Sequence, residues 1–74
     1  MAKRRFSLRF DSSREKWVLR NDVNEKIVKI FDTKEEATRA GALRKALGGQ
    51  GGTVMVRKLN GVLEEERAFP SIVD

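Results

Sequence analysis

The chain opens with a run in which apolar and polar residues alternate, and this alternation constrains the fold more than any other feature of the sequence. The apolar positions are Phe6, Leu8 and Phe10, and the positions beside them are Arg5, Ser7 and Arg9. A period of two is typical of a β-strand that buries one face and exposes the other. Residues 4–10 are therefore predicted to form a first strand with an apolar face and a basic face.

Two further strands are expected before any helix. Residues 11–13, DSS, have turn chemistry, and residues 16–21, KWVLRN, place Trp17 and Leu19 on one face of a second strand. Residues 26–31, KIVKIF, are rich in β-branched side chains and predict a third strand. We expect these three strands to form an antiparallel meander.

The third strand carries more apolar residues than one sheet face accommodates. They form two pairs on either side of Lys29, namely Ile27 with Val28 and Ile30 with Phe31. Two arrangements explain the pattern. Either a bulge re-aims part of the strand, or Val28 and Ile30 join Val18 in an apolar patch on the second face of the sheet.

A helix with clear ends follows. Thr33 and Glu36 match a capping box, which predicts a helix that begins at Lys34 and ends at Gly48 and Gly49. Its apolar residues recur at helical spacing and form a narrow stripe for packing on a sheet. The stripe consists of Ala37, Ala40, Leu43 and Leu47.

The last third of the chain predicts a hairpin. Residues 48–52, GGQGG, run from a helix to a strand, the reverse of a phosphate-binding loop, and predict a mobile connection. Strands are expected at residues 53–59 and 62–69, joined by a two-residue turn at Asn60-Gly61. This turn sets two opposed pairs, Leu59 with Val62 and Arg57 with Glu64.

Together these elements predict a single α+β domain over residues 1–74, with β-β-β-α-β-β order and one helix packed on one face of an antiparallel sheet. Within it we expect a basic arm at residues 1–4, a folded core at residues 5–69 and a C-terminal tail at residues 70–74.

The residues of catalysis are scarce. The chain has no histidine and no cysteine, which removes the commonest general base, thiol nucleophiles and most metal ligands. The run from Glu64 to Glu66 alternates between two faces and reads as a solvated strand face. We therefore expect no enzyme activity, no metal and no cofactor, and, because no apolar run approaches the length of a membrane span, a cytoplasmic protein without membrane contact.

Charge is the first indication of function. The formal net charge is +5, and residues 1–31 hold nine Lys/Arg against four Asp/Glu while residues 32–74 hold seven against seven. A basic half suggests a polyanionic partner, and the alternative is a contribution to solubility alone. The candidate nucleic-acid-binding residues are Arg4, Arg5, Arg9, Lys16 and Arg20, with Lys3 and Arg4 in a flexible arm.

The motif pattern resembles a small bacterial domain family of unknown function. Members share a W-x-V/L strand, a T-K-x-E-A helix start and a late strand, x-G turn, strand ending. The matching residues over about residues 6–69 are Trp17, Thr33, Lys34, Glu36, Ala37 and Gly61. The resemblance implies a fold and no activity.

Residues 6–45 also resemble the arm-type DNA-binding domain of tyrosine recombinases, which has a Trp-bearing strand, a basic hairpin and F-x-T-K-x-E-A at the helix start. Those domains lay their sheet in the DNA major groove. The resemblance implies DNA contact through Arg5, Arg9, Lys16 and Arg20.

A second class of function is also consistent with the sequence. A small core without disulfides favours association, and Val18, Val28 and Ile30, or an edge strand, are the candidate surface for a homodimer. The sequence thus leaves two binding functions open, nucleic acid and a second protein chain.

Overall fold

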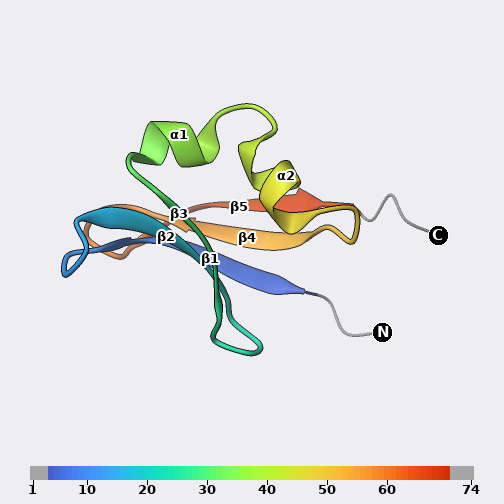
Figure 1. Ribbon diagram of the computed structural model, residues 1–74, viewed down its shortest axis with the longest axis horizontal. Coiled ribbons are helices and arrows are strands. Elements are labelled where there is room, and N and C mark those ends of the chain that lie inside the picture. The colour runs from blue at the N-terminus through green and yellow to red at the C-terminus, as the bar shows by residue number, and fades with distance from the viewer. Residues whose placement is uncertain (1–3, 71–74) are drawn as a thin grey trace.

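The computed structural model describes residues 4–70, in which two short helices cover one face of a five-stranded sheet (Figure 1). The strands are β1 (Arg5–Asp11), β2 (Lys16–Asn21), β3 (Ile27–Phe31), β4 (Gly52–Arg57) and β5 (Leu63–Phe69), and the helices are α1 (Lys34–Thr38) and α2 (Ala42–Leu47). The predicted α+β class and the order of elements are confirmed. The predicted arm at residues 1–3 and the end of the tail at residues 71–74 lie outside the described residues.

The sheet is mixed, and the prediction of a wholly antiparallel sheet is wrong at one pairing. The strand order is β3-β2-β1-β4-β5, and only β1 and β4 pair in parallel. Strand β3 lies at one edge of the sheet. From there the chain passes over one sheet face as the two helices and then forms β4, which lies beside β1 on the side away from β2. It therefore enters β4 in the direction of β1, with Phe6 beside Val54 and Leu8 beside Val56.

The core lies between the sheet and the helices. Its strand residues are Phe6, Leu8, Trp17, Leu19, Phe31, Val54 and Val56, and its helix residues are Ala37, Leu43 and Leu47. The Phe10 ring packs edge-on against Trp17, with ring centroids 5.6 Å apart, and Phe69 also packs against the core. All five aromatic side chains of the chain thus belong to the core or border it. This burial is the main source of stability for such a small domain.

The helical segment is interrupted, so the prediction of one continuous helix is wrong. Helix α1 begins as predicted, because the Thr33 side chain accepts a hydrogen bond from the Glu36 amide at 3.1 Å. It ends after Thr38, and α2 begins after Gly41, which has a φ of 83°. Thr38 bonds back to the Lys34 carbonyl, a contact that competes with helix continuation. Ala40, placed in the predicted stripe, is exposed at the break.

The β4–β5 hairpin is longer by one loop residue than predicted. The Gly61 amide donates to the Lys58 carbonyl, and the Lys58 amide donates to the Val62 carbonyl. Gly61 has a φ of 87°, whereas Asn60 does not have the positive φ that a two-residue type I′ turn requires. A three-residue loop with a left-handed glycine results, and Arg57 lies opposite Leu63 rather than Glu64.

Two irregular stretches have defined structures. The register of β2 and β3 shifts between Leu19 and Arg20, so the bulge expected as one alternative for β3 is present. Within the glycine stretch 48–52, Gly51 is buried and packs closely against the end of β5. An added Cβ on Gly51 would lie 2.2 Å from the Phe69 carbonyl oxygen, so a glycine is required there.

Candidate functional site

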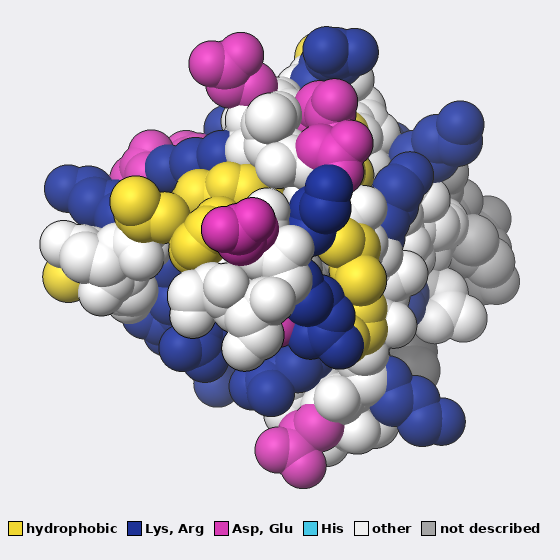
Figure 2. Space-filling model, turned by 60° about the vertical axis from the view of Figure 1, so that its left-hand side comes forward, with side chains coloured by type: hydrophobic (Ala, Val, Ile, Leu, Met, Phe, Trp, Pro, Cys, Tyr) yellow, Lys and Arg dark blue, Asp and Glu magenta, His cyan; other side chains and the backbone are white. Residues whose placement is uncertain are grey.

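The sheet face that the helices do not cover is the candidate site, and we call it the open face. On β1 it carries Arg5, Ser7 and Arg9, because these alternate with the core residues of the same strand. The register pairs Ser7 with Arg20 and Arg9 with Val18 on β2. Lys and Arg side chains occupy much of the lower half of Figure 2, away from the helices, with acidic side chains among them.

Strand β4 adds one cation that the sequence analysis did not assign to this face. Val54 and Val56 are buried in the core, so the alternation of β4 places Met55 and Arg57 on the open face. The parallel register sets Met55 beside Ser7. The sequence TVMVRKL shows the alternation of β4, but it does not show that β4 pairs with β1. This pairing places Arg57 near Arg9.

The predicted site residues differ in how their charges are already used. Arg5 and Arg9 are exposed, and within residues 4–70 neither side chain makes an ion pair or a hydrogen bond. Lys16 donates to Asp32 at 2.6 Å, and this hydrogen bond raises the pKa of the Lys16 ammonium. Arg5 and Arg9 are therefore the cations most available to a ligand.

Arg20 is held beside an acidic neighbour without a hydrogen bond to it. Its Nε atom is buried and has no hydrogen-bond partner within the described residues, and the nearest Asp22 oxygen lies 3.9 Å away. The other Asp22 carboxylate oxygen accepts a hydrogen bond from the Ser7 hydroxyl at 2.6 Å. A buried donor without an acceptor is costly, so the position of Arg20 beside Asp22 is held at the expense of one hydrogen bond.

Arg4 does not belong to the open face, and its assignment to a flexible arm is wrong. Its guanidinium lies 5.0 Å from the centre of the Phe6 ring and donates to the Leu47 carbonyl at the end of α2. Its own carbonyl accepts from the Thr53 amide. The cause is the alternation of β1, which turns Arg4 towards the helices and Arg5 away from them.

A shallow hollow of about 410 Å³ lies on the open face at the end where two turns meet it. Val18, which is only 8% exposed, and Ile27 provide an apolar part of its wall. Arg9 and Arg20 line it from the strands, and Arg14 lines it from the β1–β2 turn. Arg14 was not among the predicted site residues, because only the fold of that turn brings it to this face.

Carboxylates also reach this hollow. Asp11 and Glu25 belong to its lining. Arg14 donates to Asp11 at 2.5 Å, and this hydrogen bond lowers the pKa of the Asp11 carboxyl. Arg14 is thus paired with Asp11 and Arg20 lies 3.9 Å from Asp22, whereas Arg9 makes no ion pair among the described residues. The hollow combines cationic donors, carboxylate acceptors and an apolar surface.

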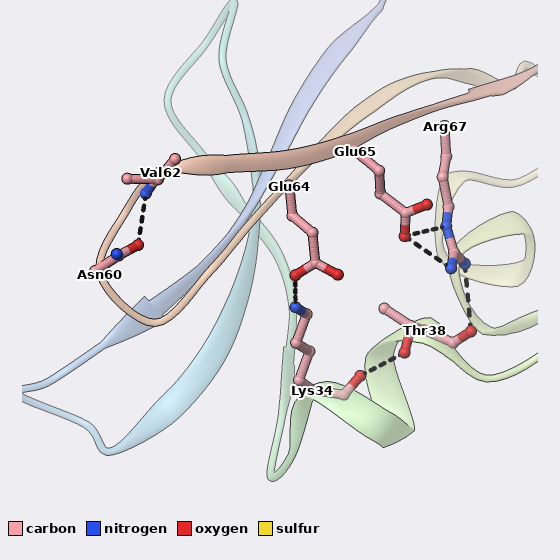
Figure 3. Close-up of polar contacts among 7 residues, drawn as sticks. All are labelled: Lys34, Thr38, Asn60, Val62, Glu64, Glu65 and Arg67. Atoms are coloured by element: carbon pink, nitrogen blue, oxygen red, sulfur yellow. Dashed lines mark hydrogen bonds and ion pairs between the residues drawn. The ribbon is translucent and has the colours of Figure 1, made fainter.

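Two of the three acidic residues of β5, Glu64 and Glu65, point towards the helices (Figure 3). Lys34 of α1 pairs with Glu64, and the Lys34 ammonium also lies 5.7 Å from the centre of the Trp17 ring. Glu65 pairs with Arg67, which also donates to the Thr38 carbonyl at the end of α1. A register shift in β4 and β5 turns Glu64 from the predicted solvated face towards α1. Glu64 and Glu65 therefore help to hold α1 against the sheet.

Two negative findings apply to the described part of the chain. No group of three or more Asp or Glu residues within residues 4–70 is arranged to hold a metal ion. Neither of the two helices there is long and apolar enough to cross a membrane.

The fold and the open face define a small α+β domain with a basic sheet surface. The chain belongs to the family described as an uncharacterized protein conserved in bacteria (DUF2188), which it matches over residues 9–69. This confirms the first of the two resemblances noted in the sequence. No curated protein and no solved structure matches the chain significantly.

Proposed function

We propose that this domain is a non-enzymatic module that binds nucleic acid through its open face. The observation that carries the proposal is the pair Arg5 and Arg9, which are exposed on one strand without an ion pair or hydrogen bond among the described residues. Each cation that neutralises a phosphate releases a counterion, so a few such contacts give substantial affinity at low salt.

The surrounding residues support this function over a general role in solubility. Arg20 and Arg57 share the open face with Arg5 and Arg9, whereas the carboxylates of Glu64 and Glu65 face the helices. The open face also carries carboxylates, namely Asp22 beside Arg20 and Asp11 and Glu25 at the hollow, so its positive potential is concentrated at Arg5 and Arg9.

The test compares two variants with the same loss of charge. Arg5→Gln/Arg9→Gln removes two cations from the open face, and Arg39→Gln/Arg44→Gln removes two exposed cations from the helical side, whose side chains also make no ion pair or hydrogen bond in the described structure. Binding to labelled oligonucleotides is followed by fluorescence anisotropy between about 50 and about 200 mM salt. The open-face variant is expected to bind weakly and to lower the salt slope of log Kd by roughly 1.5, whereas the control retains both.

Two results would contradict the proposal. Equal losses in the two variants would assign binding to overall charge rather than to the open face. An absence of binding by the unaltered protein at about 50 mM salt, where phosphate contacts are strongest, would remove the function itself.

We propose a homodimer as the second candidate, because β3 is an edge strand with exposed apolar side chains. Ile27, Val28 and Ile30 are 43, 38 and 43% exposed, whereas Val18, from the same predicted patch, is buried. The bulge in β3 and the charge of Lys29 disfavour strand pairing at this edge. Contact through side chains is therefore the more favourable mode.

The dimer is tested by mass in solution. Val28→Lys/Ile30→Lys places two charges on the proposed contact, and sedimentation should change from dimer to monomer while the circular dichroism spectrum is unchanged. A monomeric unaltered protein at about 100 μM, far above the Kd of specific complexes, would exclude this candidate.

A further inference from the structure

We infer that the ligand is a single strand of nucleic acid, with one nucleotide seated in the hollow between Arg9, Arg20 and Ile27. This inference rests on the proposed function, because it names the form of nucleic acid that the open face takes. Three observations carry it, namely the width of the sheet, the apolar wall of the hollow and the guanidinium donors beside that wall.

The width of the sheet opposes insertion into a duplex. Five strands have four spacings of about 4.8 Å, so the outer strands lie about 19 Å apart. The major groove of B-DNA is about 12 Å wide. A sheet of β1, β2 and β3 alone would be narrower by two spacings. Here β4 and β5 widen it, because they lie beside β1 on the side away from β2. The open face therefore does not enter the groove and meets a duplex only at its outer phosphates.

The composition of the hollow fits a nucleotide better than a phosphate alone. Val18 and Ile27 offer apolar surface that phosphate oxygens do not match, whereas a sugar or a base does. The volume of about 410 Å³ is sufficient for a ligand of this size, since small-molecule sites begin at about 300 Å³. In a duplex the bases are stacked inside the helix, so only an unpaired nucleotide brings its base to such a surface.

The polar groups around the hollow complement the same ligand. Arg9 is exposed and its side chain makes no hydrogen bond among the described residues, and the Arg20 side chain is 40% exposed with its Nε atom 3.9 Å from Asp22. These donors suit a phosphate oxygen or the acceptor atoms of a base, and a guanidinium plane also stacks on a base. The Glu25 carboxylate in the lining suits the amino groups of a base.

The aromatic residues indicate what kind of single-strand binding this is. Most single-strand binders stack bases on aromatic side chains, but all five here pack in or against the core, and Phe10 alone of the five also belongs to the lining of the hollow. The affinity therefore depends mainly on phosphate contacts, with a smaller apolar contribution at the hollow. We expect weak preference among bases and a steep dependence on salt.

The experiment measures three ligands against one protein. Anisotropy is recorded with single-stranded DNA, single-stranded RNA of the same sequence and the matching DNA duplex, each of about 20 nucleotides, longer than the about 4 to 16 that one small domain covers. At least one single strand should bind about tenfold more tightly than the duplex at about 100 mM salt. Comparison of the two single strands shows whether the sugar matters.

Ile27→Asn tests the hollow itself. It removes apolar surface but no charge, so single-strand binding should weaken about fivefold while the salt slope of log Kd stays the same. Ile30→Asn is the matched control, since Ile30 lies on the same strand with the same exposure of 43% but does not line the hollow. The control should bind like the unaltered protein.

The outcomes separate this inference from the proposed function. Equal or tighter binding of the duplex overturns the single-strand inference and leaves the open face as a nucleic-acid surface. An Ile27→Asn variant that folds and binds a single strand like Ile30→Asn overturns the seating of a nucleotide in the hollow. No binding of any of the three ligands overturns the proposed function together with the inference.

Discussion

The two faces of the sheet are built from the same strands but have opposite compositions. The face under the helices holds every aromatic side chain and nearly all the fully buried residues, whereas the open face holds Arg5, Arg9 and Arg20 beside Ser7 and Met55. Because residues alternate along a strand, one sequence encodes both faces at once. One face thus carries the stability of the domain and the other carries the binding that we propose. Substitutions of adjacent residues should therefore have separable effects.

The largest expected effect lies on the helix face. Phe6→Ala removes a completely buried ring from the centre of the core and should lower the free energy of unfolding by about 3–5 kcal/mol. Arg9→Ala, three positions away on the open face, should change it by less than about 0.5 kcal/mol. Urea unfolding followed by circular dichroism measures both. If Phe6→Ala does not fold, Phe6→Leu should give a smaller loss of stability with the same sign. Comparable losses for Phe6→Leu and Arg9→Ala would contradict the claim that the helix face carries the stability.

A second prediction concerns the backbone beneath the core. An added Cβ on Gly52 would lie 2.7 Å from the Phe6 ring, whereas one on Gly41 would meet nothing within 4 Å. Both glycines have positive φ, so each alanine carries a backbone cost, about 1–2 kcal/mol for Gly41 with its φ of 83° and no less for Gly52 with its φ of 144°. Gly52→Ala should lose a further 1–3 kcal/mol, roughly the cost of overpacking. Equal unfolding midpoints for the two variants would show that the Phe6 ring moves aside at no cost.

Arg4 and Arg5 are neighbours in the sequence but lie on opposite sides of the sheet, so their substitutions test the difference between the two faces. Arg4 donates to the Leu47 carbonyl at the end of α2, and Arg5 is exposed on the open face. Arg4→Gln should lower stability by about 0.5–1 kcal/mol and leave the salt slope of nucleic-acid binding unchanged. Arg5→Gln should do the reverse and reduce the slope by roughly 0.8. A larger loss of binding for Arg4→Gln than for Arg5→Gln would contradict the assignment of the faces.

The smallest expected effect is a dependence of stability on pH. The hydrogen bond from Lys34 lowers the pKa of the Glu64 carboxyl from its ordinary value of 4.5. Because the folded state holds the proton less tightly than the unfolded chain, the stabilisation is present above pH 4.5 and is lost as pH falls through the lowered pKa. Glu64→Gln should therefore be less stable than the unaltered protein at about pH 7 and match it at about pH 2. A constant difference at both values would mean that the carboxylate charge contributes nothing.

Local patterns predicted the strands well, since they are properties of consecutive residues. The bounds of β2 are those predicted, and the Thr33 cap forms as expected. The helix break was missed because Gly41 was a weak signal against an otherwise regular stripe. The three-residue hairpin loop was missed because Asn60-Gly61 is compatible with two loops, a two-residue type I′ turn with positive φ at both residues and a three-residue loop with positive φ at the glycine alone.

Non-local relations could not be predicted from one sequence. The parallel pairing of β1 with β4 depends on where the chain lands after the helices, and it decides that Arg57 joins the open face. The hollow, which draws on two turns and three strands, was not anticipated because the conformations of the two turns are not readable from the residue pattern. Among the predicted site residues, Arg5, Arg9 and Arg20 lie on the open face, Lys16 is paired with Asp32, and Arg4 lies under the helices.

The most direct test of the account is an NMR titration of the labelled protein with a single-stranded oligonucleotide. We expect amide and arginine side-chain shifts to change at Arg9 on β1, at Arg20 on β2 and at Ile27 on β3, and the Trp17 indole signal in the core to stay in place. Changes confined to α1, α2 and β5, with β1 and β2 unaffected, would contradict the claim that the open face is the binding surface.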